Sequence, residues 1–454
     1  MTFDTYLAVF QFSYSTPLAS PSAVPASDRC PASMSELSSI FPSQVHTLSA
    51  MNKIEIIVRA SQLHGKQEMA RLEQRIIGDI AVAGDLTLEE VSFPSGDGIA
   101  AILVLTGGVE REVLKVASQM PSPTILIAHP GQNSLPAALE ILARIRQDGG
   151  SGEILFGTPA EIAAGLKREV CINSAWDTLR FSRVGIIGDP SDWLVASDVD
   201  RAFLKGQMGV DLVNVSIDEL VEQSTAHKPS RSAVSKFTKS ATSVKEPGKA
   251  DLSGSVAIYE GLRSIVDKYR LSACTVRCFD LVERLNNTGC YALSRLNDEQ
   301  IIAGCEGDIQ AMFSMYLGSL LSGGATFMAN IASIDTAERN LIIAHCTCPL
   351  SLSTGFIIRS HFESSIGVGI AAQIPPGPCT LFRLGGDRLN RLFVREGTIT
   401  GSLAREDLCR TQVTLSIDGS LDPLLLSPLG NHHVLIPGHH RDTIERFFNR
   451  FLSQ

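Results

Sequence analysis

The chain has 454 residues, 44% of them hydrophobic, which exceeds one hydrophobic core and predicts two or three domains. A net charge of −9 without a basic stripe argues against a nucleic-acid partner, and no apolar run reaches the length of a membrane span. Ten cysteines without paired C-x-x-C motifs favour reduced thiols over structural zinc. We therefore expect a cytoplasmic enzyme or binding protein.

Residues 1–50 differ in composition from everything that follows. They are rich in Ser, Pro, Ala and Thr, with Asp4, Asp28, Arg29 and Glu36 as their charges. No basic segment precedes an apolar core, so the pattern argues against a secretory signal. We interpret 1–50 as a flexible extension.

Residues 51–178 are predicted to form an N-terminal α/β domain. The expected strands are Ile54–Val58, Ile99–Leu105 and Thr124–Ala128, and the last is followed by a polar loop at 129–134 and a helix over Leu135–Ile145. This order indicates a parallel sheet, whose ligands bind at the carboxyl ends of the strands. His129, Gln132 and Asn133 are therefore candidates for binding sugar hydroxyls, although loops of this composition are often plain turns.

Residues 179–348 are predicted to form a second α/β domain. Its expected elements are strands at Val184–Ile187, Asp211–Val215 and Ala273–Phe279 and a helix at Ala257–Tyr269. The candidate substrate-binding residues here are Asp192 and Trp193, after the first strand, and Arg277, a cation in an apolar run. The polar, Ser-rich stretch 225–252 has no periodicity and is predicted to be a mobile insertion.

The end of this domain carries the most informative stretch. Apolar residues at helical spacing begin at Ile309 and stop at Gly323, which predicts an amphipathic helix with one buried face. Glu306 falls at the expected helix start, inclined toward that face, where a carboxylate needs a cation, a donor or a proton. Two short strands follow, and the second ends on His345. A glutamate and a histidine in these places are plausible metal ligands.

Residues 349–454 are predicted to form a β-rich C-terminal domain, a compact antiparallel sheet or small barrel. The expected strands are Gly355–Ile358, Gly367–Ala372, Cys379–Leu384, Arg391–Glu396 and Gln412–Leu415. Near its end stand His432 and His433, ahead of a helix over Arg441–Phe451. Glu306, His345 and one of these two histidines would suit a divalent metal such as manganese. The alternatives are a core histidine at 345 and an exposed loop at 432–433.

Several stretches resemble the L-fucose/L-arabinose isomerase superfamily, particularly its fucose-isomerase-like branch. The matching blocks are TVRCFDL at 275–281, CEGD at 305–308, FMANIASID at 327–335, LIIAHCTCP at 341–349, HFESSIGVGI at 361–370 and GNHHVLIPG at 430–438. VLTGGVE at 104–110 and the segment 129–142 are also similar, so the resemblance covers most of 51–454. It implies two parallel-sheet α/β domains followed by a β-rich domain.

The resemblance also implies an activity, the interconversion of an aldose and a ketose through an enediol with Mn²⁺. It makes Glu306 a metal ligand that also moves a proton, and His432 (or His433) and His345 further ligands. It implies a homo-oligomer, a trimer or a hexamer, acting in carbohydrate metabolism.

One position departs from the family pattern. Asn330 stands where fucose isomerases have a second metal-binding acid, and an amide can ligate a metal but cannot accept and return a proton. Asp308 or Asp335 would then supply the missing base, unless Asp308 is a first-turn acid and Asp335 a turn residue. The rival hypothesis is a non-catalytic or regulatory sugar-binding protein on the same fold.

Overall fold

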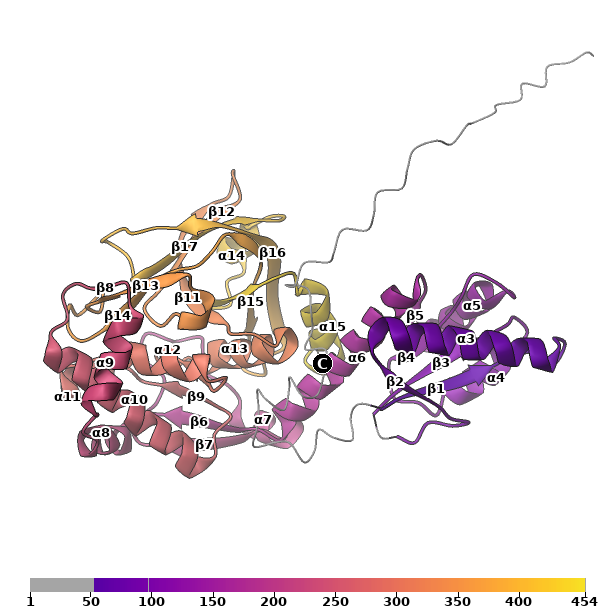
Figure 1. Ribbon diagram of the computed structural model, residues 1–454, viewed down its shortest axis with the longest axis horizontal. Helices are drawn as coiled ribbons and strands as arrows, with labels where there is room; N and C mark the ends of the chain where they lie inside the picture. The colour runs from indigo at the N-terminus through magenta and orange to yellow at the C-terminus, as the bar shows by residue number, and fades with distance from the viewer. Residues whose placement is uncertain (1–52, 97, 454) are drawn as a thin grey trace, which may run out of the picture.

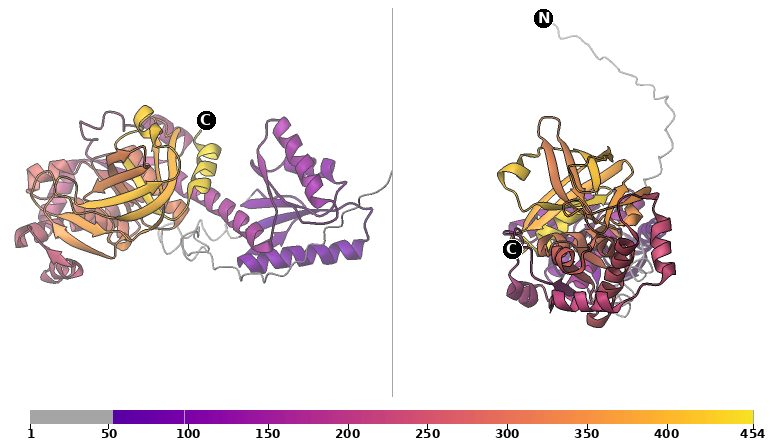
Figure 2. Two further views of the ribbon diagram at one scale, coloured as in Figure 1. Left: turned by 90° about the horizontal axis from the view of Figure 1, so that it is seen from above. Right: turned by 90° about the vertical axis from the view of Figure 1, so that its left-hand side faces the viewer.

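The computed structural model describes residues 53–96 and 98–453. They form two parallel α/β units and an antiparallel barrel, in the order that the sequence predicted. The N-terminal unit lies at one end of the molecule, and the second sheet and the barrel lie together at the other (Figure 1). The view from above in Figure 2 shows the same separation. The extension predicted at 1–50 lies outside the described residues.

The N-terminal unit is built on a parallel five-stranded sheet of order β2-β1-β3-β4-β5. Its elements are β1 (Lys53–Arg59), α3 (Lys66–Gly84), β2 (Thr87–Glu90), β3 (Ile99–Val104), α4 (Glu110–Ala117), β4 (Thr124–Ile127), α5 (Ser134–Gln147), β5 (Gly152–Leu155) and α6 (Pro159–Arg180). Strand β3 is buried throughout, because α3 and α6 cover one face of the sheet and α4 and α5 the other. Residues 129–134 follow β4 at the carboxyl edge, as predicted.

The second unit has a parallel sheet of order β10-β9-β6-β7. Its elements are β6 (Arg183–Ile187), α7 (Arg201–Gln207), β7 (Asp211–Val215), α8 (Ile217–Ala226), α10 (Lys249–Tyr269), β9 (Ala273–Val276), α11 (Phe279–Leu285), α12 (Cys290–Asp298), β10 (Ile302–Gly304) and α13 (Ile309–Ser322). Helix α6 joins the two units, because Leu166 packs in the N-terminal core and Ile172 in the second core. Within the described ranges, no helix is long and apolar enough to cross a membrane.

Helix α13 occupies the place that the sequence predicted, and Gly323 ends it in the left-handed conformation with φ of 68°. The prediction of a single buried face is wrong, since every residue from Ile309 to Leu321 is buried. The reason is tertiary: α13 packs against β9 and β10 of the second sheet as well as β15 and β18 of the barrel. A helix between two layers has no face left for solvent.

The prediction of a mobile insertion without regular structure at 225–252 is also wrong. This stretch contains α9 (Arg231–Ser240) and β8 (Ser243–Val244), and α10 already begins at Lys249. Phe237 is buried and stacks on Tyr291 of α12 with ring centroids 3.7 Å apart. The other apolar residues of this helix, Ala233 and Val234, are small and half-buried, so the helical periodicity in the sequence is weak.

The C-terminal strands close a barrel of order β11-β12-β17-β16-β15-β18, which confirms the small antiparallel barrel. Its elements are β11 (Phe327–Asp335), β12 (Asn340–His345), β15 (Gly377–Gly385), β16 (Arg391–Ser402), β17 (Thr411–Ile417), α14 (Asp422–Leu426), β18 (His432–Pro437) and α15 (Arg441–Phe451). Strands β11 and β12 were predicted in the second α/β domain, yet they pair within the barrel. The barrel therefore begins at Phe327, well before the boundary expected at 349.

A small separate sheet links the insertion to the barrel region. It has the order β14-β13-β8, formed by β13 (Gly355–Arg359), β14 (Gly369–Gln373) and β8. Strand β8 pairs in parallel with β13 through Ser243 and Val244. The segment predicted to be mobile thus contributes a strand.

We expect Phe237→Ala to lower the free energy of unfolding by about 3–5 kcal/mol, because it empties a buried aromatic site. Lys239→Ala on the exposed side of the same helix is the matched control and should change it by less than about 0.5 kcal/mol. Urea unfolding followed by circular dichroism measures both. Equal, negligible effects would show that α9 is not packed in solution.

Candidate metal centre

Glu306 lies in the turn between β10 and α13, not at the helix start that the sequence predicted. The helix begins at Ile309, and Asp308 is its N-cap. Glu306 and Gly307 are both left-handed, with φ of 62° and 74°, and a Cβ on Gly307 would lie 2.7 Å from Pro190 Cα. This tight turn against the loop after β6 aims the Glu306 side chain at the barrel.

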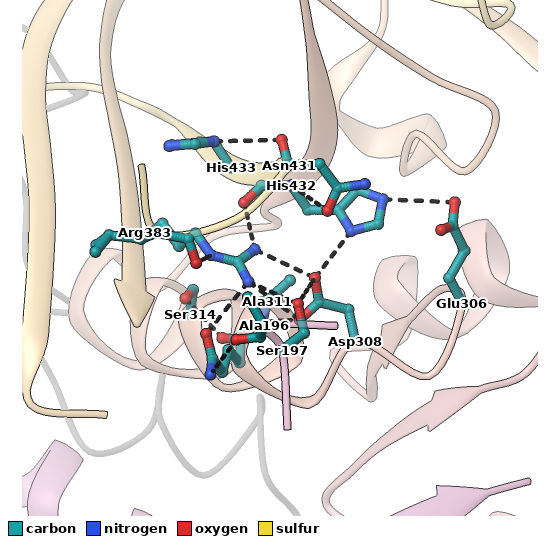
Figure 3. Close-up of polar contacts among 12 residues, drawn as sticks. Ala196, Ser197, Glu306, Asp308, Ala311, Ser314, Arg383, Asn431, His432 and His433 are labelled. Atoms are coloured by element: carbon teal, nitrogen blue, oxygen red, sulfur yellow. Dashed lines mark hydrogen bonds and ion pairs between the residues drawn. The ribbon is translucent and has the colours of Figure 1, made fainter. Parts of the chain in front are cut away.

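Two barrel histidines meet that carboxylate. His345 ends β12, and its Nε2 lies 3.8 Å from Glu306 Oε1. His432 begins β18, and its Nε2 lies 3.5 Å from the same oxygen (Figure 3). One ligand atom from each of the three residues lies within 4.8 Å of the other two, and all three residues are buried. Three converging N and O donors in a buried place fit a divalent cation.

The second ring nitrogen of each histidine is held by a neighbour. His345 Nδ1 lies 2.8 Å from Thr347 Oγ1, and His432 Nδ1 lies 2.9 Å from Asp308 Oδ2. His432 Nε2 has no hydrogen-bond partner within the described part of the chain. Both Nε2 atoms therefore face Glu306, as a metal ligand must face its ion.

The charged groups of the centre shift each other's pKa values. Burial alone would raise the pKa of Glu306, but His345 and His432 outweigh it and hold the pKa far below its usual range. Burial alone would lower the pKa of His432, yet the carboxylates of Asp308 and Glu306 raise it to about 9. Arg383 balances the negative charge of Asp308. The negative charge of Glu306 therefore attracts a metal cation or, without one, holds a proton on His432.

His433, the other predicted candidate ligand, is not part of the cluster. Successive side chains of a strand point to opposite faces, so His433 turns away from Glu306 and its ring meets Phe393 edge-on at 5.2 Å. Burial and the nearby Arg383 lower its pKa to about 3. The structure brings together His432 and not His433.

Asp308, the predicted alternative base, lies behind His432 and not beside the cavity. Its side chain is fully buried, and its pKa is lowered to about 2 because Arg383 and His432 outweigh its burial. A fully buried, ionised carboxylate cannot reach a substrate. Asp335, the other candidate base, is a turn residue, which was the alternative given for it. Its side chain accepts hydrogen bonds from the backbone of Ala337 and Glu338.

A cavity of about 20 Å³ opens beside the cluster. Glu306, Asn330 and His345 line it together with Glu363, which the sequence analysis did not single out. Asn330 accepts a hydrogen bond of 3.1 Å from Asn431 through its side-chain oxygen. Glu363 lies within HFESSIGVGI at 361–370, and the resemblance of this segment to the isomerase superfamily is the feature of the sequence that could have indicated it.

Of the predicted substrate-binding residues, three lie at the carboxyl edge of the second sheet. Trp193 Nε1 donates a hydrogen bond of 2.7 Å to Glu306 Oε2, so it orients the glutamate. Arg277 pairs with Asp192 at 3.1 Å and with Asp280 at 3.0 Å. These contacts tie the loop after β6 to the start of α11.

The other three, His129, Gln132 and Asn133, lie at the carboxyl edge of the N-terminal sheet, at the opposite end of the molecule (Figure 1). Gln132 and Asn133 line a separate cavity of about 450 Å³, and His129 Nε2 lies 2.9 Å from Leu105 O. Within a single chain these three residues and Glu306 do not form one site, because two different sheets carry them.

The chain is similar in sequence to several sulfoquinovose isomerases. No protein-family model matches the chain. It is 25% identical to a sulfoquinovose isomerase of Clostridium sp. (strain MSTE9) over 256 residues, 54% of this chain and 57% of that protein. It is 24% identical to sulfoquinovose isomerases of Priestia megaterium (strain ATCC 12872 / QMB1551), over 51% of this chain and 54% of that protein, and of Alkalicoccus urumqiensis, over 56% and 59%. The chain thus spans about half the length of the curated relatives it matches.

The geometry predicts one divalent metal ion per chain, measurable by titration calorimetry with Mn²⁺ as the probe after treatment with a chelator. Glu306→Gln should weaken binding by more than about 100-fold, because it removes the one charged donor. His433→Gln, beside a predicted ligand but facing away, is the matched control and should change the affinity less than twofold. A thermal melt of each variant verifies folding, and equal loss in both variants would contradict the assignment.

Proposed function

We propose that the protein is a divalent-metal-dependent aldose–ketose isomerase of the L-fucose/L-arabinose isomerase superfamily. The observation that carries this proposal is the convergence of Glu306, His345 and His432 from three separate elements. The names of the similar proteins support the class of reaction and make sulfoquinovose the first sugar to test. Mn²⁺, a trimer or hexamer and a cytoplasmic location remain predictions of the resemblance.

Glu306, His345 and His432 would hold the metal. When bound, a divalent metal supplies Lewis-acid polarisation of two adjacent oxygens of the open-chain sugar, which acidifies the C–H bond between them. Trp193 fixes the Glu306 carboxylate through its indole N–H. The two histidines hold the pKa of Glu306 far below its usual range despite its burial, so the carboxylate is ionised, as a metal ligand must be.

Glu363 is the group that we propose to move the proton. It lines the same cavity as Glu306 and Asn330, and partial burial raises its pKa although much of the side chain remains exposed. A carboxylate with a raised pKa is a stronger proton acceptor than an ordinary glutamate and can return the proton afterwards. Glu363 would therefore take the role that the amide of Asn330 cannot fill.

The cavity of about 20 Å³ has room for roughly one water molecule. Sugar binding therefore requires a local opening. The loop at 361–366 is the part we expect to move, because it connects β13 and β14 at the surface, where Glu363 and Ser365 are exposed.

The test is incubation of the purified protein with Mn²⁺ and a panel containing sulfoquinovose, L-fucose and L-arabinose, in D₂O. We expect ketose formation and deuterium incorporation at C2 of the aldose, both followed by NMR. A chelator should abolish turnover and added Mn²⁺ should restore it. Failure to convert any sugar with the metal bound would overturn the proposal.

Glu363→Gln should lower kcat by about 100-fold or more and leave the affinity for Mn²⁺ within twofold. Glu338→Gln, an exposed residue of the β11–β12 turn, is the control and should retain full activity. Unchanged kcat in Glu363→Gln would exclude Glu363 as the proton-moving group.

The second candidate function is sugar binding without turnover, which Asn330 favours because the expected second acid is missing. It predicts measurable sugar affinity in calorimetry with no deuterium incorporation in wild-type protein. Glu306→Gln would then leave the sugar affinity largely intact.

A further inference from the structure

We propose that the buried pair Asp308–Arg383 is a positioning device that fixes the tautomer and the orientation of His432. This inference deepens the proposed function and rests on the metal role of His432. Figure 3 shows the order of the groups, with Arg383, Asp308, His432 and Glu306 in a row. Neither Asp308 nor Arg383 touches the candidate cavity, so both act through the histidine.

The contact to the ring is specific. His432 Nδ1 lies 2.9 Å from Asp308 Oδ2, and an ionised carboxylate can only accept. A histidine must be neutral to bind a metal, and in that state the one ring proton sits on Nδ1, where Asp308 accepts it. The lone pair is then on Nε2, the atom that faces Glu306 at 3.5 Å.

Asp308 is itself fixed from several directions. It accepts hydrogen bonds from Ala311 N at 2.8 Å as the N-cap of α13 and from Ser197 Oγ at 3.2 Å. Its position at the positive end of a helix further stabilises the charged form. A carboxylate with this many donors has one orientation, and so does the ring that it holds.

Arg383 is fully buried in β15 and supplies the countercharge. Its Nη1 lies 3.2 Å from Asp308 Oδ2 and donates to His432 O at 2.6 Å. One guanidinium therefore binds both the carboxylate that orients the ring and the backbone that carries it. Gly430 leaves room for this contact, since a Cβ there would overlap Arg383 Nη2.

Another nitrogen of Arg383 connects to the loop after β6, directly and through Gln310 of α13. Nη2 lies 3.1 Å from Ser197 Oγ in that loop and 3.3 Å from Gln310 Oε1. Gln310 in turn donates to the carbonyls of Ala196 and Asp198 at 2.9 Å each. The same loop carries Trp193, which orients Glu306. The network thus holds two of the proposed ligands in register.

The decisive variant is Asp308→Asn, measured by Mn²⁺ calorimetry without sugar. The amide keeps the size and the N-cap oxygen but loses the charge that fixes the proton on Nδ1. Outer residues of this kind contribute about 10–100-fold to metal affinity, and we expect a loss in that range. ¹⁵N NMR of His432 in the metal-free protein, at a pH at which the ring is neutral, should show the proton on Nδ1 in the wild type and a changed tautomer signal in Asp308→Asn.

The matched control is Glu169→Gln, which breaks another buried pair, Glu169–Arg450, between α6 and α15. Both variants leave an arginine uncompensated and should lower stability, but only Asp308→Asn should weaken metal binding. If Asp308→Asn does not fold, the double variant Asp308→Asn with Arg383→Gln removes both charges and should show the same loss of affinity.

Wild-type affinity in either folded Asp308 variant would overturn the inference. An equal loss in Glu169→Gln would also overturn it, because the effect would then be general. A protein that binds Mn²⁺ with these differences but converts no sugar would refute the proposed isomerase and retain the positioning role.

Discussion

The arrangement of the candidate centre depends on one buried ion pair between Asp308 and Arg383. Both side chains are fully buried, and isolated charges in such a place would be strongly unfavourable. Their pairing lets a carboxylate stand behind His432 without attracting the metal itself. The charge of Glu306 is then free for the candidate ion, and the ring nitrogens of the two histidines face it.

The ion pair also joins parts of the chain that fold as different layers. Asp308 caps α13, which lies between the second sheet and the barrel, while Arg383 and His432 belong to the barrel strands β15 and β18. Glu306 comes from the carboxyl edge of the parallel sheet, where ligands of α/β proteins bind. The proposed site therefore exists only where the barrel is docked on that edge.

The surroundings of the site bear on the missing second acid. Asn330 lines the cavity as an amide that is already hydrogen-bonded to Asn431. Glu363 lies in a loop between β13 and β14 and reaches the same cavity from another direction. A proton-moving group supplied by a different segment would preserve the proposed chemistry despite the departure at position 330.

Local sequence patterns predicted many of the helices and strands. Buried runs such as Ile99–Leu105 predicted strands, the spacing from Ile309 to Gly323 predicted α13, and short strands between turn residues predicted the barrel, since these signals arise from neighbours in sequence. Helix α9 was not predicted, because the residue that holds it in place, Phe237, stacks on Tyr291, which is distant in the sequence. Strands β11 and β12 were assigned to the wrong layer because pairing partners are not local.

By itself, the sequence determined which side chains could bind a metal: an inward glutamate, a strand-end histidine and a histidine pair. Only the tertiary structure decided between His432 and His433, because strand register sends one toward Glu306 and the other toward Phe393. It also turned Asp308 from a candidate base into a buried partner of Arg383, and it separated His129 from the centre. These outcomes depend on the tertiary arrangement, such as the contact of His432 with Glu306 and that of Asp308 with Arg383, 75 positions apart, which no local pattern encodes.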